Sequence, residues 1–166
     1  MKSDTFWYRY IYPKNLTLFE QPKLVAPEIS QGGNFTYDTD GRYYSTTTVY
    51  GYIKSDKYPF SYYTLMAFLN SLICWWFISK TGTTLANGYY RFKPAYLKPF
   101  HIPNITIEDD LRLSNLSMQI ISESDSRKRE ALMDEINALV FSLYQLDGSE
   151  IAVIKNNKLA IAGNLL

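Results

Sequence analysis

The stretch of sequence that decides the fold is FSYYTLMAFLNSLICWWFISKTG, residues 60–82, in which apolar and aromatic side chains follow one another with few interruptions. Three leucines and a tryptophan recur there at intervals of four, three and four residues: Leu65, Leu69, Leu72 and Trp76. This spacing predicts a helix with one face in a core. Gly82 follows the last apolar turn, which predicts that the helix ends there in a left-handed C-cap.

The same run also has the length of a short membrane span. Residues 60–78 are 19 residues long, lie between two lysines and have tyrosines and tryptophans near their ends, as spans with aromatic belts do. Ser61, Thr64 and Ser71, however, fall in one narrow sector of the helix, away from the leucines. The sequence therefore favours a buried helix of a soluble domain, and a short-span membrane protein is the least favoured interpretation.

Charge and aromatic side chains divide the chain into two parts. Residues 1–103 carry 11 basic and 6 acidic side chains, net +5, whereas residues 104–166 carry 6 basic and 10 acidic ones, net −4. Of the 27 Phe, Trp and Tyr residues, all but Phe141 and Tyr144 lie in the first part. The sequence predicts an α+β fold, with a mixed strand-and-helix module over residues 1–103 followed by an acidic helical hairpin and C-terminal tail over residues 104–166.

Short strands and turns are predicted in the first part. Alternating or β-rich runs predict strands at residues 7–12, 23–29, 35–37 and 43–53. Asp40-Gly41 predicts a hairpin between the third and fourth of these strands, and Asn87-Gly88 predicts a second hairpin joining residues 83–86 to 89–92. Pro94, Pro99 and Pro103 predict an extended stretch after it.

Helical periodicity begins after residue 105. Apolar spacing predicts one helix over residues 108–121 and another over residues 132–143, with a polar break at 123–129 between them. Asp147-Gly148 predicts the end of the second helix, and Ser149 is expected to cap a third, short helix beginning at Glu150.

Motifs of catalytic chemistry are absent from the sequence. His101 is the one histidine, and Cys74, the one cysteine, lies in the apolar run, where a thiol behaves as a small buried hydrophobe. No Gly-rich phosphate loop, nucleophile elbow or Asn-Pro-Pro-aromatic tetrapeptide occurs. We therefore expect no catalytic residue, metal or cofactor in this chain, and without a visible secretory signal the cytoplasm is the expected compartment.

Basic side chains are interleaved with tyrosines and threonines in the first part. They are Lys14, Lys23, Arg42, Lys54, Lys57, Lys80, Arg91, Lys93 and Lys98. Cations attract phosphates, while polar side chains on loops can reach base edges or sugars. The composition suits duplex DNA, although a Tyr-rich core with ordinary surface lysines has the same composition.

The order of short segments resembles a known family. The segments are Pro22-Lys23-Leu24-Val25 with Pro27 and Ile29, the Asp40-Gly41 turn with the strand through Thr48–Ile53, Leu69-Asn70-Ser71, and Tyr96-Leu97-Lys98 leading into Ile102-Pro103. In this order they resemble the TaqI-like C-terminal specificity domain, the target-recognition part of adenine-specific DNA methyltransferases and of single-chain restriction-modification enzymes. Residues 135–151 are similar to the helical ending that those enzymes share with the specificity subunits of Type I systems. An aspartate often stands in that ending where this chain has Asn137.

The resemblance implies sequence-specific recognition of double-stranded DNA, with no catalysis by this chain alone. It also implies a partner, the catalytic methyltransferase part of the same parent enzyme, which would use S-adenosylmethionine. On a basic face that would dock on the DNA backbone, we expect phosphate contacts by Lys54, Lys80, Arg91 and Lys93. From the two predicted hairpins and the loop after the apolar helix we expect base or sugar contacts by Arg42, Tyr44, Thr83, Thr84 and Asn87.

Two other uses of the chain remain open from its sequence. A non-catalytic interaction or scaffold module would use the helical hairpin to dock a partner, and its cations would be spread over all faces. A leftover apolar face on that hairpin would favour self-association.

Overall fold

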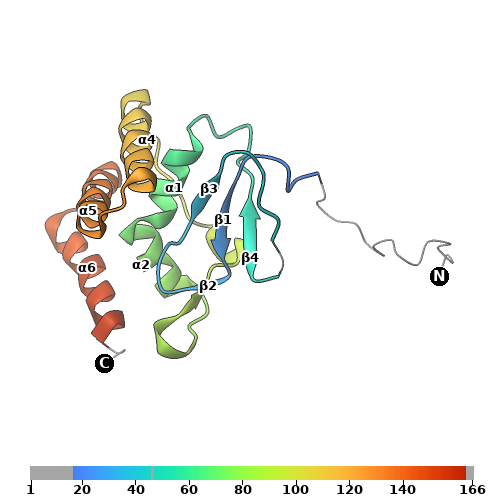
Figure 1. Ribbon diagram of the computed structural model, residues 1–166. Helices are drawn as coiled ribbons and strands as arrows, with labels where there is room; N and C mark the ends of the chain where they lie inside the picture. The colour runs from blue at the N-terminus through green and yellow to red at the C-terminus, as the bar shows by residue number, and fades with distance from the viewer. Residues whose placement is uncertain (1–16, 46, 164–166) are drawn as a thin grey trace, which may run out of the picture.

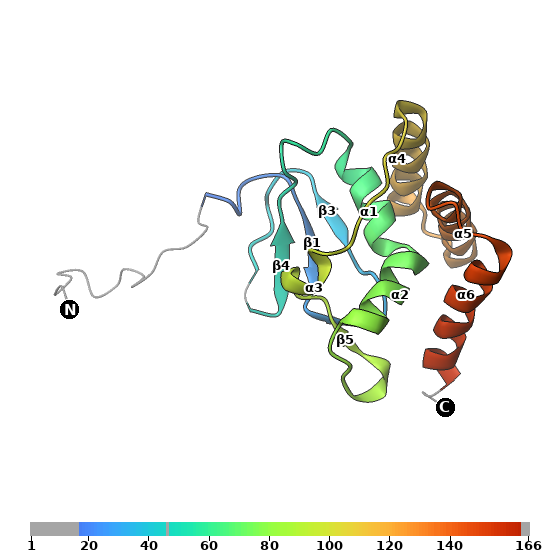
Figure 2. The ribbon, with the colours of Figure 1, turned by 180° about the vertical axis from the view of Figure 1, so that it is seen from behind.

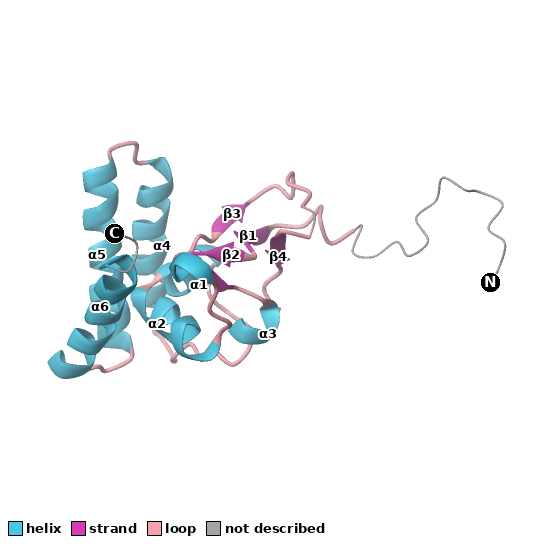
Figure 3. Ribbon diagram, turned by 90° about the horizontal axis from the view of Figure 1, so that it is seen from below, coloured by secondary structure: helices cyan, strands magenta, loops and turns pink. Residues whose placement is uncertain are grey.

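The computed structural model describes residues 17–45 and 47–163, which are arranged in three layers (Figure 1). A small antiparallel sheet forms one outer layer, and the two halves of the apolar run form the middle layer. The C-terminal helices form the other outer layer (Figure 3). The predicted α+β class is confirmed. The strand predicted at residues 7–12 lies outside the described residues.

The three-stranded sheet has the order β3-β1-β4, and its neighbours are antiparallel. The strands are β1 (Lys23–Pro27), β3 (Thr36–Asp38) and β4 (Val49–Tyr52). Leu24 of β1 lies opposite both Tyr37 and Tyr52. The hairpin predicted between residues 35–37 and 43–53 is therefore wrong, because both segments pair with β1 and not with each other.

A buried carboxylate turns the chain at Asp40-Gly41 without a hairpin. The Asp38 carboxylate accepts hydrogen bonds from the backbone N–H groups of Arg42 and Tyr43, each at 3.0 Å. A side chain thus closes the turn in place of a ladder, and the chain continues past β1 to reach β4. Gly41 is required here, because its φ is 65° and a Cβ would lie 2.3 Å from the backbone of Glu20.

A second, two-stranded sheet pairs β2 (Ile29–Ser30) with β5 (Tyr90–Arg91). The strand predicted over residues 23–29 is therefore divided, and the break comes directly after Pro27, which has no N–H to donate. The Asn87-Gly88 turn is confirmed, since both residues have positive φ (59° and 70°) within the short 3₁₀ segment η1 (Ala86–Gly88). The Leu85 N–H donates to the Tyr89 carbonyl at 2.7 Å, and Thr84 bridges Tyr90.

The apolar run folds as two helices, α1 (Tyr62–Asn70) and α2 (Leu72–Thr81), bent by 58°. The single helix predicted from the spacing is wrong at Ser71. The Ser71 hydroxyl donates to the Phe68 carbonyl at 2.7 Å and accepts from the Cys74 N–H at 3.3 Å, so it ends one helix and begins the next. Gly82 is extended, with φ −88°, so the left-handed cap is also wrong.

In the described part of the chain, no single helix is long and apolar enough to span a membrane. The α1–α2 pair has a sufficient length and composition only when its two bent halves are taken together. Side chains on both halves are buried inside the protein, among them Phe68, Cys74 and Ile78.

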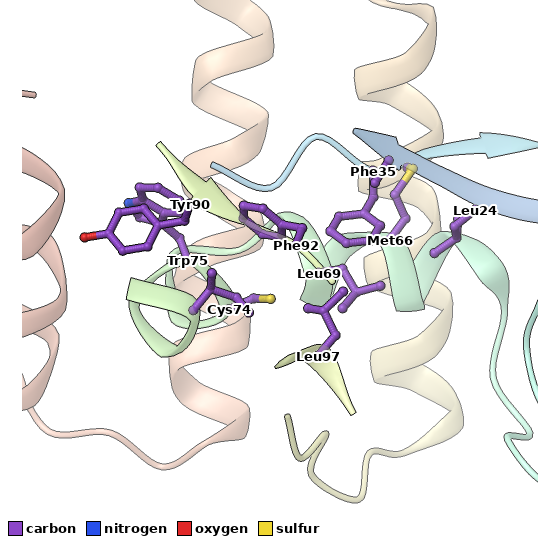
Figure 4. Close-up of a cluster of buried hydrophobic side chains, with 11 residues drawn as sticks. Leu24, Phe35, Met66, Leu69, Cys74, Trp75, Tyr90, Phe92 and Leu97 are labelled. Carbon is purple, nitrogen blue, oxygen red and sulfur yellow. The ribbon is translucent and has the colours of Figure 1, made fainter. Parts of the chain in front are cut away.

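The middle layer contributes apolar side chains to two cores. One core lies against the strands, where Met66, Leu69 and Trp75 pack with residues such as Leu24 of β1 and Phe92, which directly follows β5 (Figure 4). The other core lies against the C-terminal helices and contains buried side chains from both layers: Ala67, Phe68, Ile73, Leu113, Leu116, Ile136, Val140, Phe141 and Ile154. Cys74 is fully buried, as expected, and burial raises the pKa of its thiol to about 12.

The polar sector of α1 is buried against α4 (Ile107–Ser122). The hydroxyls of Ser61 and Ser114 share a hydrogen bond of 2.5 Å, and that of Thr64 lies 3.0 Å from Ser114 Oγ. Ser117 Oγ donates to the Tyr63 carbonyl at 3.0 Å. Small hydroxyl residues therefore form the contact between these two helices.

The C-terminal layer consists of α4, α5 (Ser126–Leu143) and α6 (Gly148–Gly163). The first two confirm the predicted helices, although α5 begins six residues before the predicted start of 132, because Asp125 Oδ1 caps the N–H groups of Arg127 and Lys128. The third helix is longer than predicted and is capped by Asp147 rather than by Ser149. The stretch predicted as extended contains the helical turn α3 (Pro94–Leu97).

Candidate nucleic-acid interface

The structure separates the predicted DNA-contacting residues into two groups at opposite ends of β1. Asp38, which binds the backbone of Arg42, pairs with Lys23 at the start of β1, and Ile53 and Lys54 follow β4 at the same end. Arg42, Tyr44 and Lys54 therefore belong to this end. The other six predicted residues lie on or beside residues 82–93, beyond the far end of the strand (Figure 2). They are Lys80, Thr83, Thr84, Asn87, Arg91 and Lys93.

Residues 82–93, here called the 82–93 hairpin, present polar side chains on an exposed turn. Thr83, Thr84 and Asn87 are all exposed. The Gln31 amide donates to the Asn87 carbonyl at 2.7 Å, which ties the turn to the end of β2 and leaves the Asn87 side chain outward. The Thr83 hydroxyl lies 2.7 Å from the Tyr96 hydroxyl, so its position is fixed from α3.

The sequence around this hairpin is free of carboxylates. Residues 57–107 contain no Asp or Glu, while they contain Lys57, Lys80, Arg91, Lys93 and Lys98. Such a stretch gives a positive local potential on a chain of nearly neutral net charge. In space, the Glu28 carboxylate reaches this stretch, where it pairs with Arg91.

The cations near the hairpin differ in their existing partners. Arg91 Nη1 lies 3.0 Å from Glu28 Oε1, and this ion pair supports the β2–β5 contact. Lys80 Nζ donates to Asn157 Oδ1 on α6 at 3.2 Å, an exposed contact that a phosphate could replace. Lys93 precedes α3 and is partly exposed.

The group at the other end of β1 is tied to protein partners. The exposed Arg42 guanidinium pairs with Asp40 at 2.8 Å. Tyr44 donates to Glu20 at 3.1 Å, and its ring stacks on Phe19 with centroids 5.5 Å apart. Carboxylates beside both residues oppose an approaching phosphate.

Lys54 has an internal role in the structure. Its Nζ donates to the Tyr58 carbonyl at 2.8 Å and lies over the rings of Tyr58 and Tyr62, 5.8 and 5.9 Å from their centroids. The ammonium thereby holds the loop that leads into α1.

Lys23, one of the interleaved cations, is buried and cannot reach a phosphate. Its Nζ lies 2.5 Å from Asp38 Oδ2, and both side chains are 2% exposed. Burial acts to raise the pKa of Asp38, but hydrogen bonds from Lys23 and from the backbone of Tyr43 and Arg42 outweigh it and hold that pKa below its usual value. The pair is a structural ion pair beneath the loop after β3.

The Asn70 of the Leu69-Asn70-Ser71 segment bonds to the residue that precedes β3. Its amide accepts from the Phe35 N–H at 2.8 Å and donates to the Phe35 carbonyl at 2.9 Å. Two residues further along the chain, at the start of α2, the Leu72 N–H donates to Asn137 Oδ1 of α5 at 2.8 Å. An aspartate could accept the same bond, so the departure from the family pattern at Asn137 preserves the contact at the start of α2.

Two surface residues near the groups were missed by the sequence interpretation. Gln31 positions the tip of the 82–93 hairpin, but it lies 56 residues from Asn87 and no local pattern relates them. Tyr43 is 68% exposed and lies between Arg42 and Tyr44. It was missed because the β-rich run over residues 43–53 predicted a strand there.

Two hollows of about 360 and 420 Å³ lie on the face of the sheet that α1 leaves uncovered. Among the described residues that line these hollows, the single charged side chain is Lys23, and it is already paired with Asp38. The ammonium of S-adenosylmethionine would need a carboxylate, so these linings do not fit that cofactor. Across residues 17–45 and 47–163, no group of three or more His, Cys, Asp or Glu could hold a metal ion.

Comparison with known proteins agrees with this arrangement of segments. Residues 5–102 match the TaqI-like C-terminal specificity domain. The chain is 27% identical over 166 residues to the type II methyltransferase M.BstVI of Geobacillus stearothermophilus, covering 93% of this chain and 26% of that protein. It is 27% identical over 103 residues to the type II methyltransferase M.XhoI of Xanthomonas vasicola, covering 62% of this chain and 18% of that protein. The chain thus spans about a quarter or less of these relatives, and with more than half of its own length matched it belongs to the family of TaqI-like C-terminal specificity domains.

Proposed function

We propose that this chain recognises a short sequence of double-stranded DNA for a type II DNA methyltransferase. The observation that carries the proposal is the match of residues 5–102 to a specificity domain. The relatives are named as methyltransferases, and this chain corresponds to a minor share of their length. The chain would therefore supply target recognition in the cytoplasm, while the remaining methyltransferase part would bind S-adenosylmethionine and catalyse transfer.

The 82–93 hairpin supports a specific mode of recognition. A two-stranded ribbon fits the major groove, where each base pair presents a distinct set of donors and acceptors. The Asn87 amide can bond to an adenine edge, and the Thr84 hydroxyl can donate or accept. Lys80 and Lys93 flank the turn, so they would contact phosphates and set its register.

Within this proposal the two groups of predicted residues differ in role. The 82–93 hairpin reads bases, since its polar side chains are exposed and no carboxylate lies within residues 57–107. Arg42 and Tyr44 already have carboxylate partners, so they contribute little to affinity.

The experiment measures binding of the full chain to mixed-sequence duplex DNA by fluorescence anisotropy at several salt concentrations. We expect weak binding that falls steeply with salt, because each phosphate contact releases counterions. Lys93→Ala should lower affinity about three- to tenfold and reduce the salt slope by about one contact. Lys128→Ala, the same charge change on α5 and away from the hairpin, is the matched control and should change affinity less than about twofold.

Selection from a random duplex pool then tests sequence recognition. Asn87→Ala should relax the preference at one base position, at a cost of about 1–3 kcal/mol for that base. A folded chain that shows no binding at low salt would contradict the proposal and favour the interaction module. Equal losses for Lys93→Ala and Lys128→Ala would contradict the assigned surface.

A further inference from the structure

The 82–93 hairpin turns at a peptide bond that its own residues hold weakly. Asn87 and Gly88 both have positive φ, 59° and 70°, as a type I′ turn requires. Gly88 accepts φ of either sign, so sterics restrain the peptide between these two residues from the Asn87 side alone. The hydrogen bond within the turn, from the Tyr89 N–H to the Ala86 carbonyl, is 3.4 Å long and lies beyond the usual range.

A side chain from outside the hairpin holds this peptide. The Gln31 amide donates to the Asn87 carbonyl at 2.7 Å, which is shorter than the hydrogen bond within the turn. A peptide flip reverses the direction of its carbonyl, so this bond can form in one of the two orientations only. Gln31 therefore selects the observed turn, in which the Asn87 side chain is exposed.

Gln31 is itself attached to a well-packed part of the fold. Ser30, directly before it, is 4% exposed, and its hydroxyl accepts a hydrogen bond from the Asn34 amide. Gly33, two residues after it, packs so closely on the end of α1 that a Cβ would have no room beside the Leu69 carbonyl. The Gln31 amide thus links the tip of the hairpin to the core.

This hydrogen bond contributes little to the stability of the folded chain, because it is exposed and exchanges with bonds to water. Its consequence is the conformation of the tip. A bidentate contact from an asparagine amide to an adenine edge needs the amide in a fixed direction. A turn that samples two orientations must be ordered on binding, and that ordering lowers affinity for the preferred base.

We infer that Gln31 is a positioning residue for base recognition, which it serves by fixing the peptide between Asn87 and Gly88. The inference rests on the proposed function. Gln31 acts through Asn87 and needs no base contact of its own. The preference at the base pair that Asn87 reads therefore depends on Gln31, whereas the phosphate contacts of Lys80 and Lys93 do not.

The first test is Gln31→Met, which keeps the length of the side chain and removes its donor. Selection from a random duplex pool, followed by anisotropy with single-base variants of the selected duplex, measures base preference. We expect discrimination at one base position to fall about three- to tenfold, and affinity for mixed-sequence duplex to change less than about twofold. Gln119→Met makes the same change at an exposed position of α4 and should alter neither quantity.

A double-mutant cycle separates positioning from a general structural effect. Asn87→Ala removes the contact that Gln31 positions, so adding Gln31→Met to it should change that base preference by less than about twofold. A loss that adds fully to that of Asn87→Ala would overturn the inference. So would a loss spread evenly over all base positions, because Gln31 would then not act through Asn87.

The turn can also be observed without DNA. By NMR order parameters and relaxation dispersion, Gln31→Met should make the Gly88 amide more mobile than in the native chain. An unchanged Gly88 amide would overturn the inference, whatever the chain binds. A native chain without duplex binding overturns the proposed function and the role of Gln31 in recognition with it. A native sequence preference that Gln31→Met leaves intact overturns this inference alone.

Discussion

The turns at Asp40-Gly41 and Asn87-Gly88 are alike in sequence and different in structure. Both reverse the chain at a glycine with positive φ. The loop after Asp38 is held from inside by the buried Lys23–Asp38 pair, whereas the 82–93 hairpin is held by backbone bonds and leaves its polar side chains exposed. The comparison teaches that a turn dipeptide specifies a reversal, while the surroundings decide whether the reversal supports the core or leaves its polar side chains exposed.

The largest effect on stability is expected from removing one member of the buried Lys23–Asp38 pair, which holds the first turn. Lys23→Met leaves the Asp38 carboxylate buried without its cation, and we expect a loss of about 3–5 kcal/mol in the free energy of unfolding. The double variant K23M/D38L removes both charges and should recover much of that loss. Urea denaturation measures both variants, and a double variant as unstable as the single one would show that packing, not charge, decides.

Acid should weaken the same turn selectively. The pKa of Asp38 is lowered in the folded state, so its contribution to stability is present above the unfolded value near 4 and is lost as the pH falls through the folded pKa. Urea denaturation from pH 6 to pH 3 should therefore show a steeper loss for the native chain than for K23M/D38L. Parallel curves for the two proteins would refute this assignment, since Asp109 and Asp147, which also have lowered pKa values, are present in both.

The two glycines should respond unequally to alanine. At Gly88 an alanine meets the strain of a positive φ, which costs about 1 kcal/mol. At Gly41 the added Cβ also lies 2.3 Å from the Glu20 backbone, so we expect a loss of about 2–3 kcal/mol. Thermal unfolding of Gly41→Ala and Gly88→Ala compares them, and equal shifts would contradict the close packing of the first turn.

The smallest effect on stability is expected at the tip of the 82–93 hairpin. Asn87→Gly removes the exposed side chain and keeps the positive φ accessible, so the free energy of unfolding should change by less than about 0.5 kcal/mol. Gln31→Ala removes the amide that holds the Asn87 carbonyl and should be similarly mild. Calorimetry measures both variants, and a large destabilisation would place this turn among the structural elements.

The local sequence pattern predicted helices correctly where the structure of a segment depends mainly on its own residues. Helical periodicity gave α4 and α5, because apolar residues at helical spacing need a packed face wherever that face points. The burial of Cys74 followed from its place in the apolar run. The family segments were also readable from the sequence, and residues 5–102 match that family.

Pattern could not predict how distant segments pair. The break at Ser71 depends on bonds to Phe68 and Cys74 that compete with a continuous helix, and helical spacing is unchanged across it. Both groups of predicted residues contain basic and uncharged polar side chains, so composition does not separate them. Their separation to opposite ends of β1 follows from register alone.

The sequence by itself determined the α+β class, the buried apolar run, the helical C-terminal part and the two chain reversals. These depend on residues within one helical turn or one hairpin of each other, where sterics and periodicity act directly. The tertiary structure alone decided the strand order, the internal role of Lys23 and the free surface of the 82–93 hairpin. These depend on contacts such as Lys23–Asp38, Gln31–Asn87 and Lys80–Asn157, between residues 15, 56 and 77 apart, which form only when the whole core is packed.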